Sequence, residues 1–213
     1  MRIALITENS QNAKNPQIEA ALRKIVEPMG HTVFNYGMYA DEGSAPLTYV
    51  QNGILAAVLL NGGAVDYVVT GCGTGEGAML SCNSFPGVLC GHVADPLDAY
   101  TFAQVNDGNA IAMPFALKNG WGMELNWEYV FEKLFGTESG QGYPPERAEP
   151  EQRNKRILDG VRAATLRPFV AGLMDIDREL VRGALSTERF QEYFFANATD
   201  EDVIAAVKEI LGL

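Results

Sequence analysis

Positive charge is scarce in this chain. Its 213 residues include 16 lysines and arginines but 27 aspartates and glutamates, which gives a formal net charge of −11. Nucleic acids and anionic membrane surfaces attract basic proteins, so we expect neither as a partner. An anionic small molecule would also be repelled at long range, and local cations or backbone amides would have to hold it.

Long apolar runs, cysteine and histidine are also in short supply. No apolar stretch approaches the ~18 residues that a membrane-spanning helix needs, and Met1-Arg2 leads into a strand-like run rather than a signal peptide. The three cysteines lack the paired spacing of a metal site and indicate reduced thiols, so we expect a cytoplasmic protein. A cysteine hydrolase needs a histidine partner, and the chain has only His31 and His92.

Strand-like and helix-like segments alternate through residue 135. Short apolar runs typical of buried strands occur at 2–8, 31–36, 65–72, 88–93 and 109–114. Segments with helical spacing occur at 16–30, 49–61, 76–84, 95–106 and 123–135. This alternation predicts an α/β, Rossmann-like three-layer fold with a five-stranded parallel sheet and right-handed crossovers.

The composition changes after Gly136. Residues 137–145 resemble a linker, and residues 151–213 have helical patterns throughout. We therefore expect a Rossmann-like domain at 1–145 and a helical C-terminal extension at 146–213. The extension is short for a separate domain, so we expect it to pack on the body or on a partner subunit.

The third strand-like run leads into a glycine-rich loop, with the sequence VTGCGTGEG at 69–77. Its free backbone N–H groups, together with the N-terminus of a helix expected from Glu76, would form a site for a phosphate or a developing oxyanion. The helix dipole would favour the thiolate of Cys72, and Thr74 can donate or accept a proton nearby. We therefore take this loop as the chemical centre.

Two other interpretations of the loop stay open. Gly73, Gly75 and Ala78 fit the dinucleotide pattern G-x-G-x-x-A, and Asp95 lies about 20 residues further on, where a ribose-binding acid is expected. However, the loop follows the third strand and not the first. Alternatively, the glycines only allow a helix and the sheet to pack closely.

Ligands of parallel sheets bind beyond the carboxyl ends of the strands, so the loops there should converge. The residues that we expect at this crevice are Glu8, Asn9, Cys72, Thr74, Glu76, Asp95 and Asn109. Simpler roles stay open: Glu8 and Asn9 as capping or loop residues, 106–109 as a turn, and His92 as a satisfied core histidine.

The remaining cysteines and His31 are expected outside this crevice, and a group of basic residues is expected near the end of the body. Cys82 and Cys90 fall on apolar positions and belong in the core, and His31 begins a strand at the opposite edge of the sheet. A basic group near the end of the body is either a solvated helix face or a clamp for an anionic substrate. Its members are Arg147, Arg153, Lys155 and Arg156.

Four segments together resemble the type B ribose-5-phosphate isomerase and galactose-6-phosphate isomerase family. They are the loop at 69–77, Asn83, the Pro-Gly-Val at 86–88 and QVNDGN at 104–109, and the resemblance covers about residues 1–160. It implies a Rossmann-like domain, a homodimer or tetramer with active sites at the subunit interface, and no metal or organic cofactor. The implied activity is aldose–ketose isomerisation of a small pentose or tetrose phosphate.

The resemblance also implies roles for individual residues. Cys72 matches the catalytic base, which moves a proton between C1 and C2 through a cis-enediolate, and Thr74 matches a hydroxyl residue near the ring oxygen of the sugar. The remaining substrate contacts are Glu8 and Asn9 after the first strand, Tyr49, the loop residues Gly73, Gly75, Glu76 and Gly77, Asn106, and the phosphate-binding Arg153.

The chain departs from the family pattern at several positions. Glu8 and Asn9 replace an Asp-His pair, Val105 replaces the ring-opening histidine, and Ala116 replaces a phosphate-binding arginine. Ala78 stands where some members have a glutamate base. These changes suggest a substrate that cannot close a ring or is not phosphorylated, or a role for His92 in ring opening. A non-catalytic protein that binds a sugar phosphate or a nucleotide is the alternative.

Overall fold

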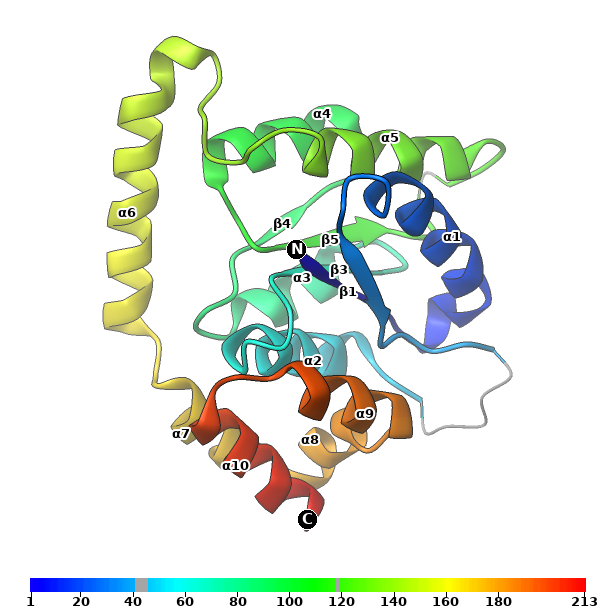
Figure 1. Cartoon of the computed structure of the whole chain (residues 1–213), viewed down its shortest axis with the longest axis vertical. Helices are drawn as coiled ribbons and strands as arrows, with labels where there is room; N and C mark the ends of the chain where they lie inside the picture. The colour runs from blue at the N-terminus through cyan, green and yellow to red at the C-terminus, as the bar shows by residue number, and fades with distance from the viewer. Residues whose placement is uncertain (41–45, 118) are drawn as a thin grey trace.

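The computed structural model describes residues 1–40, 46–117 and 119–213, and they build one parallel sheet between helices (Figure 1). Strands β1 (Arg2–Thr7), β2 (Thr32–Asn35), β3 (Tyr67–Cys72), β4 (Cys90–His92) and β5 (Ala110–Pro114) pair in the order β2-β1-β3-β5-β4. Every neighbouring pair is parallel. The predicted five-stranded parallel sheet is confirmed.

The strands are buried on both faces because their side chains alternate between two apolar clusters. In β1, Ile3 and Leu5 contact one cluster, and Ala4 and Ile6 contact the other. The first cluster lies under α1 (Asn15–Val26), α4 (Pro96–Thr101) and α5 (Met123–Phe135), and the second lies under α2 (Tyr49–Asn61) and α3 (Glu76–Asn83). The result is the three-layer fold that the sequence predicts.

Helix starts follow local capping signals. Thr48 and Gln51 form a capping box at α2, in which each side chain bonds the backbone of the other residue. Asp95 caps α4 through hydrogen bonds from Leu97 N and Asp98 N, and Pro96 follows at the first helical position. The Asp95 carboxylate is thus used as a cap, which leaves the dinucleotide interpretation without its ribose-binding acid.

The extension divides into an exposed helix and a packed group. Helix α6 (Ala148–Thr165) stands at the side of the sheet and buries no residue. Helices α7 (Phe169–Asp175), α8 (Arg178–Leu185), α9 (Glu188–Asn197) and α10 (Glu201–Leu211) pack beneath α2 in Figure 1. Their buried side chains, including Val181, Phe190 and Phe194, join the same cluster as α2. These four helices therefore pack on the body.

Several segments are more ordered than the sequence suggests. A 3₁₀-helix, η1 (Asn9–Lys14), fills the expected polar loop after β1, and a second one, η3 (Pro145–Arg147), precedes α6. A π-helical turn, η2 (Phe102–Asn106), ends the helix that starts at Pro96. The linker-like stretch is docked on η2, because Gly140 N and Gly142 N donate to Ala103 O and Gln104 O. Within the described residues, no helix combines the length and apolarity needed to cross a bilayer.

Candidate active site

The glycine loop turns sharply between β3 and α3. Gly75, the residue before α3, has a φ of +82°, a conformation that favours glycine. A Cβ atom there would lie 2.8 Å from Met113 C and 2.9 Å from His92 Nε2. Both the backbone conformation and the surrounding atoms therefore require glycine at this position.

The loop is fixed through its carbonyl groups. Phe115 N donates to Cys72 O at 2.9 Å, and Ala116 N and Leu117 N donate to Gly73 O at 3.0 and 2.8 Å. By contrast, the N–H groups of residues 73–77 have no hydrogen-bond acceptor among the described residues. A rigid row of unpaired N–H groups at a helix N-terminus can stabilise an anion or a developing oxyanion.

Cys72 is the last residue of β3 and lies at the start of this row. Its side chain is buried, with 7% of the residue surface exposed, and its Sγ lies 4.0 Å from Oγ1 of the exposed Thr74. Cys82 and Cys90 are buried in the core, as the sequence predicts. A hydrogen bond with Cys82 and burial raise the pKa of the Cys90 thiol well above its ordinary value. Of the three cysteines, Cys72 is therefore the one at the carboxyl end of a strand, beside the glycine loop.

His92 supports the loop from β4. Its Nε2 lies 2.9 Å from the carbonyl oxygen of Thr74, and a carbonyl can only accept, so Nε2 donates this hydrogen bond. The ring is partly exposed, at the carboxyl end of its strand. This contact assigns His92 a structural role in holding the loop.

The two residues after β1 differ in exposure. The Glu8 side chain is buried and caps η1, because its carboxylate accepts a hydrogen bond from Ser10 N at 2.7 Å and another from the Ser10 hydroxyl. Asn9 is exposed, and its backbone N donates to Leu47 O. The capping interpretation of Glu8 is therefore confirmed, and it turns the carboxylate inward.

Tyr49 and Glu76 lie at the rim of the loop. Tyr49 begins α2 and is 48% exposed, and its ring would lie 3.1 Å from a Cβ atom at Gly77. The ring therefore covers the first turn of α3. Glu76 is exposed at the first position of α3. Both residues therefore lie beside the end of the glycine loop where α3 begins.

Asn106, Asn109 and Arg153 lie at the opposite edge of the sheet. Asn109 directly precedes β5, and its side chain bonds Leu89 N at 2.8 Å and Gly87 O at 2.7 Å. The expectation that Asn109 lines the crevice is therefore wrong, because a residue before a strand lies at its amino end. Asn106 lies on η2, which contacts α6, the helix that carries Arg153, and the length of β5, roughly 15 Å, separates η2 from Cys72.

The sequence interpretation missed two residues of η1 that face the glycine loop. Gln11 is buried, and its Nε2 lies 3.9 Å from the position of a Cβ atom at Gly73. Lys14 extends across to the loop after β5, where its Nζ donates a hydrogen bond to Phe115 O. The sequence signal for these residues was their place in the polar loop after the first strand, at the carboxyl ends of the strands.

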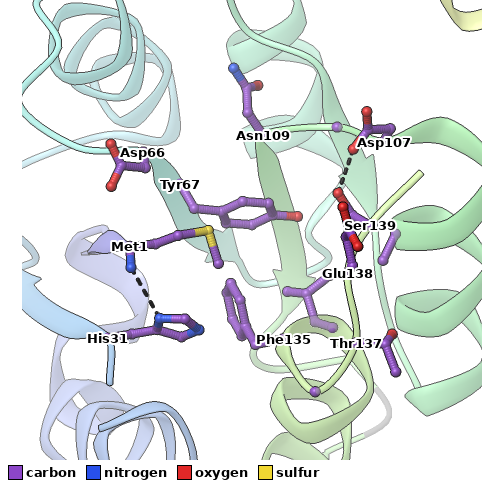
Figure 2. A pocket seen from close by; sticks show the side chains of 14 residues that line it. Met1, His31, Asp66, Tyr67, Asp107, Asn109, Phe135, Thr137, Glu138 and Ser139 are labelled. Carbon is purple, nitrogen blue, oxygen red and sulfur yellow. Dashed lines mark hydrogen bonds between the residues drawn. The ribbon is translucent and has the colours of Figure 1, made fainter. Parts of the chain in front are cut away.

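A cavity of about 580 Å³ lies at the amino ends of the strands, away from Cys72 (Figure 2). Tyr67 and Phe135 form its aromatic side, with ring centroids 5.1 Å apart, and Asp107 bonds Ser139 at its rim. His31 lies here too, 3.0 Å from the terminal nitrogen of Met1, which confirms its expected place. No group of three or more metal-ligating side chains occurs in the part of the chain that the structure describes.

Comparisons with known families match the chain in two places. A family model described as ribose/galactose isomerase matches residues 3–133, and one described as ribose-5-phosphate isomerase matches residues 164–210. No protein of curated function matches the chain.

Two solved structures are similar over the whole chain. A 4-deoxy-L-threo-5-hexosulose-uronate ketol-isomerase complexed with a tartrate is 55% identical, with a TM-score of 0.98 and 100% of both chains covered. A ribose-5-phosphate isomerase from Vibrio parahaemolyticus is 50% identical, with a TM-score of 0.96 and 99% of both chains covered. Both relatives therefore share the C-terminal extension.

A more distant structure shares the fold alone. The type B ribose 5-phosphate isomerase of Leishmania infantum is 17% identical, with a TM-score of 0.62. The match covers 98% of that chain but 78% of the present one. Of these three structures, the two nearer relatives match the chain over its whole length.

Proposed function

We propose a function from one premise: the chain belongs to the ribose/galactose isomerase family, and both full-length relatives are sugar isomerases. We propose that it interconverts the aldose and ketose forms of a small, acyclic, anionic sugar, with Cys72 as the base. One observation carries this proposal: a thiol lies beside a row of unpaired backbone N–H groups at the carboxyl ends of the strands.

Cys72 starts the reaction in this proposal. Its thiolate removes the proton from C2 of the aldose, the electron pair forms a C1=C2 double bond, and negative charge develops on O1. The thiol then returns the proton to C1, while a proton moves from O2 to O1 and leaves a ketone at C2. Thr74, whose Oγ1 is 4.0 Å from the sulfur, is placed to carry this second proton.

The glycine loop supplies the stabilisation that a carbon acid needs. The N–H groups of residues 73–77 are held in place by the carbonyl contacts to Phe115, Ala116 and Leu117, so they need no reorganisation when charge develops. Removing one such donor typically slows a reaction about 10²–10³-fold. Tyr49 covers this turn and is placed to contact the sugar.

The departures from the family pattern favour a uronate as the substrate. A 4-deoxy-5-hexosulose uronate has no hydroxyl on C4 and has a ketone instead of a hydroxyl on C5. It therefore lacks the hydroxyl groups that would close a furanose or pyranose ring on the C1 aldehyde. Such a sugar needs no ring-opening acid, which agrees with Val105. It carries a carboxylate instead of a phosphate, which agrees with Ala116, and the 55% identical relative acts on this sugar by its name.

Ribose 5-phosphate is the second candidate. The observation in its favour is the 50% identical relative from Vibrio parahaemolyticus, which is described as a ribose-5-phosphate isomerase. For this substrate, the chain would need a group that opens the furanose ring, and His92 already donates its Nε2–H to Thr74 O.

We also propose that the protein works as a homodimer. Asn106 and the helix that carries Arg153 lie at the edge opposite to Cys72, so both residues could complete only the site of a second copy. Helix α6 has an exposed apolar face, with Ile157, Leu158 and Val161 each at least 41% exposed. A two-fold dimer would cover this face and place both residues in the opposite site.

A substrate panel tests the proposal. We expect kcat/KM for 4-deoxy-L-threo-5-hexosulose uronate to exceed that for ribose 5-phosphate and for a tetrose 4-phosphate by about 100-fold, the discrimination that pocket contacts can provide. A preference for ribose 5-phosphate would contradict the uronate as substrate and support the second candidate. Turnover of none of the three sugars would contradict the proposal.

A further inference from the structure

The loop after β5 has alanine at position 116, where the family resemblance places an arginine. This loop lies directly against the glycine loop: Phe115 N donates to Cys72 O, and Ala116 N donates to Gly73 O. A positive charge at this point would lie next to the reacting part of the site. The structure supplies one from a different segment.

Lys14 reaches this point from the end of η1. Its Nζ donates a hydrogen bond to Phe115 O, so the ammonium is anchored at the residue that pairs with Cys72. The cap from Glu8 holds the first turn of η1, and Gln11 packs between η1 and Gly73. The backbone of Lys14 is therefore held by η1, and its ammonium is held by Phe115 O.

The charge of Lys14 is not neutralised by a carboxylate of the described residues. It forms none of the ion pairs found in the described residues, and only one of its three N–H donors is used. The side chain is partly buried, which strengthens its interaction with an anion relative to a fully solvated lysine. In a chain of net charge −11, such a cation is well placed to hold an anionic substrate.

We propose that Lys14 binds the carboxylate of the substrate and so replaces the family's missing arginine. The inference rests on the proposed function, in which the substrate is an acyclic anionic sugar. The ammonium is a compact positive charge with three N–H donors, so it can bind a carboxylate as the guanidinium of an arginine can. Lys14 therefore becomes a specificity-determining residue for acid sugars.

Anion binding and kinetics of variants test this role. In Lys14→Met we expect the Kd for tartrate, measured by calorimetry, and the KM for the uronate to rise about 10- to 100-fold, as for a lost hydrogen bond to a charged group. We expect kcat to change by less than about threefold, because the carboxylate is held alike in the ground and transition states. Lys14→Arg should recover most of the affinity.

Lys133→Met is the matched control, because it removes the same charge from an exposed residue that pairs with Glu132. It should bind tartrate like the wild type. If Lys14→Met fails to fold, Lys14→Arg and the salt dependence of wild-type tartrate binding carry the test. Unchanged tartrate affinity in Lys14→Met would overturn the inference, as would a wild-type protein that binds neither tartrate nor inorganic phosphate. The tartrate measurement needs no turnover, so failure of the proposed reaction is seen separately.

Discussion

The structure restricts the residue type at Gly75 much more strongly than at Gly73. A Cβ atom at Gly73 would meet its nearest neighbours at 3.9 Å, an ordinary contact, whereas Gly75 combines a φ of +82° with neighbours at 2.8 and 2.9 Å. The left-handed conformation alone costs a non-glycine residue about 1–2 kcal/mol. The crowding by Met113 and His92 adds to this cost.

We therefore expect Gly75→Ala to lower the free energy of unfolding by at least about 1–2 kcal/mol and to abolish activity, because the loop must move. For Gly73→Ala, the free energy of unfolding should lie within about 0.5 kcal/mol of the wild-type value. Denaturant titration of both variants measures the difference. Equal stability of the two variants would show that the turn at Gly75 is not constrained as described.

The helices and strands of the sheet could be predicted because their signals are local. The run at 65–72 is apolar on both faces, and Asp95-Pro96 and Thr48 mark helix starts by their own side chains. The apolar run begins at 109 and the strand begins at Ala110. Either start places Asn109 at the amino end of β5, so its expected place in the crevice already conflicted with the predicted strand.

The candidate site could be predicted only where one segment contains it. Cys72, Thr74 and the loop glycines are consecutive in the sequence, so their proximity is a matter of spacing. By contrast, the contacts of Lys14 with Phe115 O and of His92 with Thr74 O join segments that are distant in sequence. No periodic pattern encodes such tertiary contacts, and η1 has the composition of a polar loop.

Helix α6 is the element that the proposed dimer would cover. Its residues are all exposed or partly exposed, whereas α7–α10 are anchored by buried residues such as Phe190 and Phe194. The exposed helix carries Arg153, and the buried group packs under α2. In the proposed dimer, each copy of the chain would therefore contribute residues to a site at each edge of its sheet.

Mixing two inactive variants tests this arrangement. If Cys72→Ala and Arg153→Ala damage different halves of one site, heterodimers regain one intact site. An equal mixture that has been allowed to exchange subunits should then recover about a quarter of wild-type activity, as expected for random pairing in a two-fold dimer. No recovery, in a mixture shown by light scattering to contain dimers, would contradict a site shared between subunits.

The central claim is that Cys72 transfers the proton, and incorporation of solvent deuterium into the uronate during turnover tests it most directly. In Cys72→Ala, we expect both isomerisation and deuterium incorporation to fall by about 10²–10⁴-fold, the contribution typical of a positioned base, while the Kd for tartrate stays within a few-fold of the wild type. Cys90→Ala, which removes a core thiol, should incorporate deuterium at the wild-type rate. Deuterium incorporation at the wild-type rate in Cys72→Ala would contradict the account.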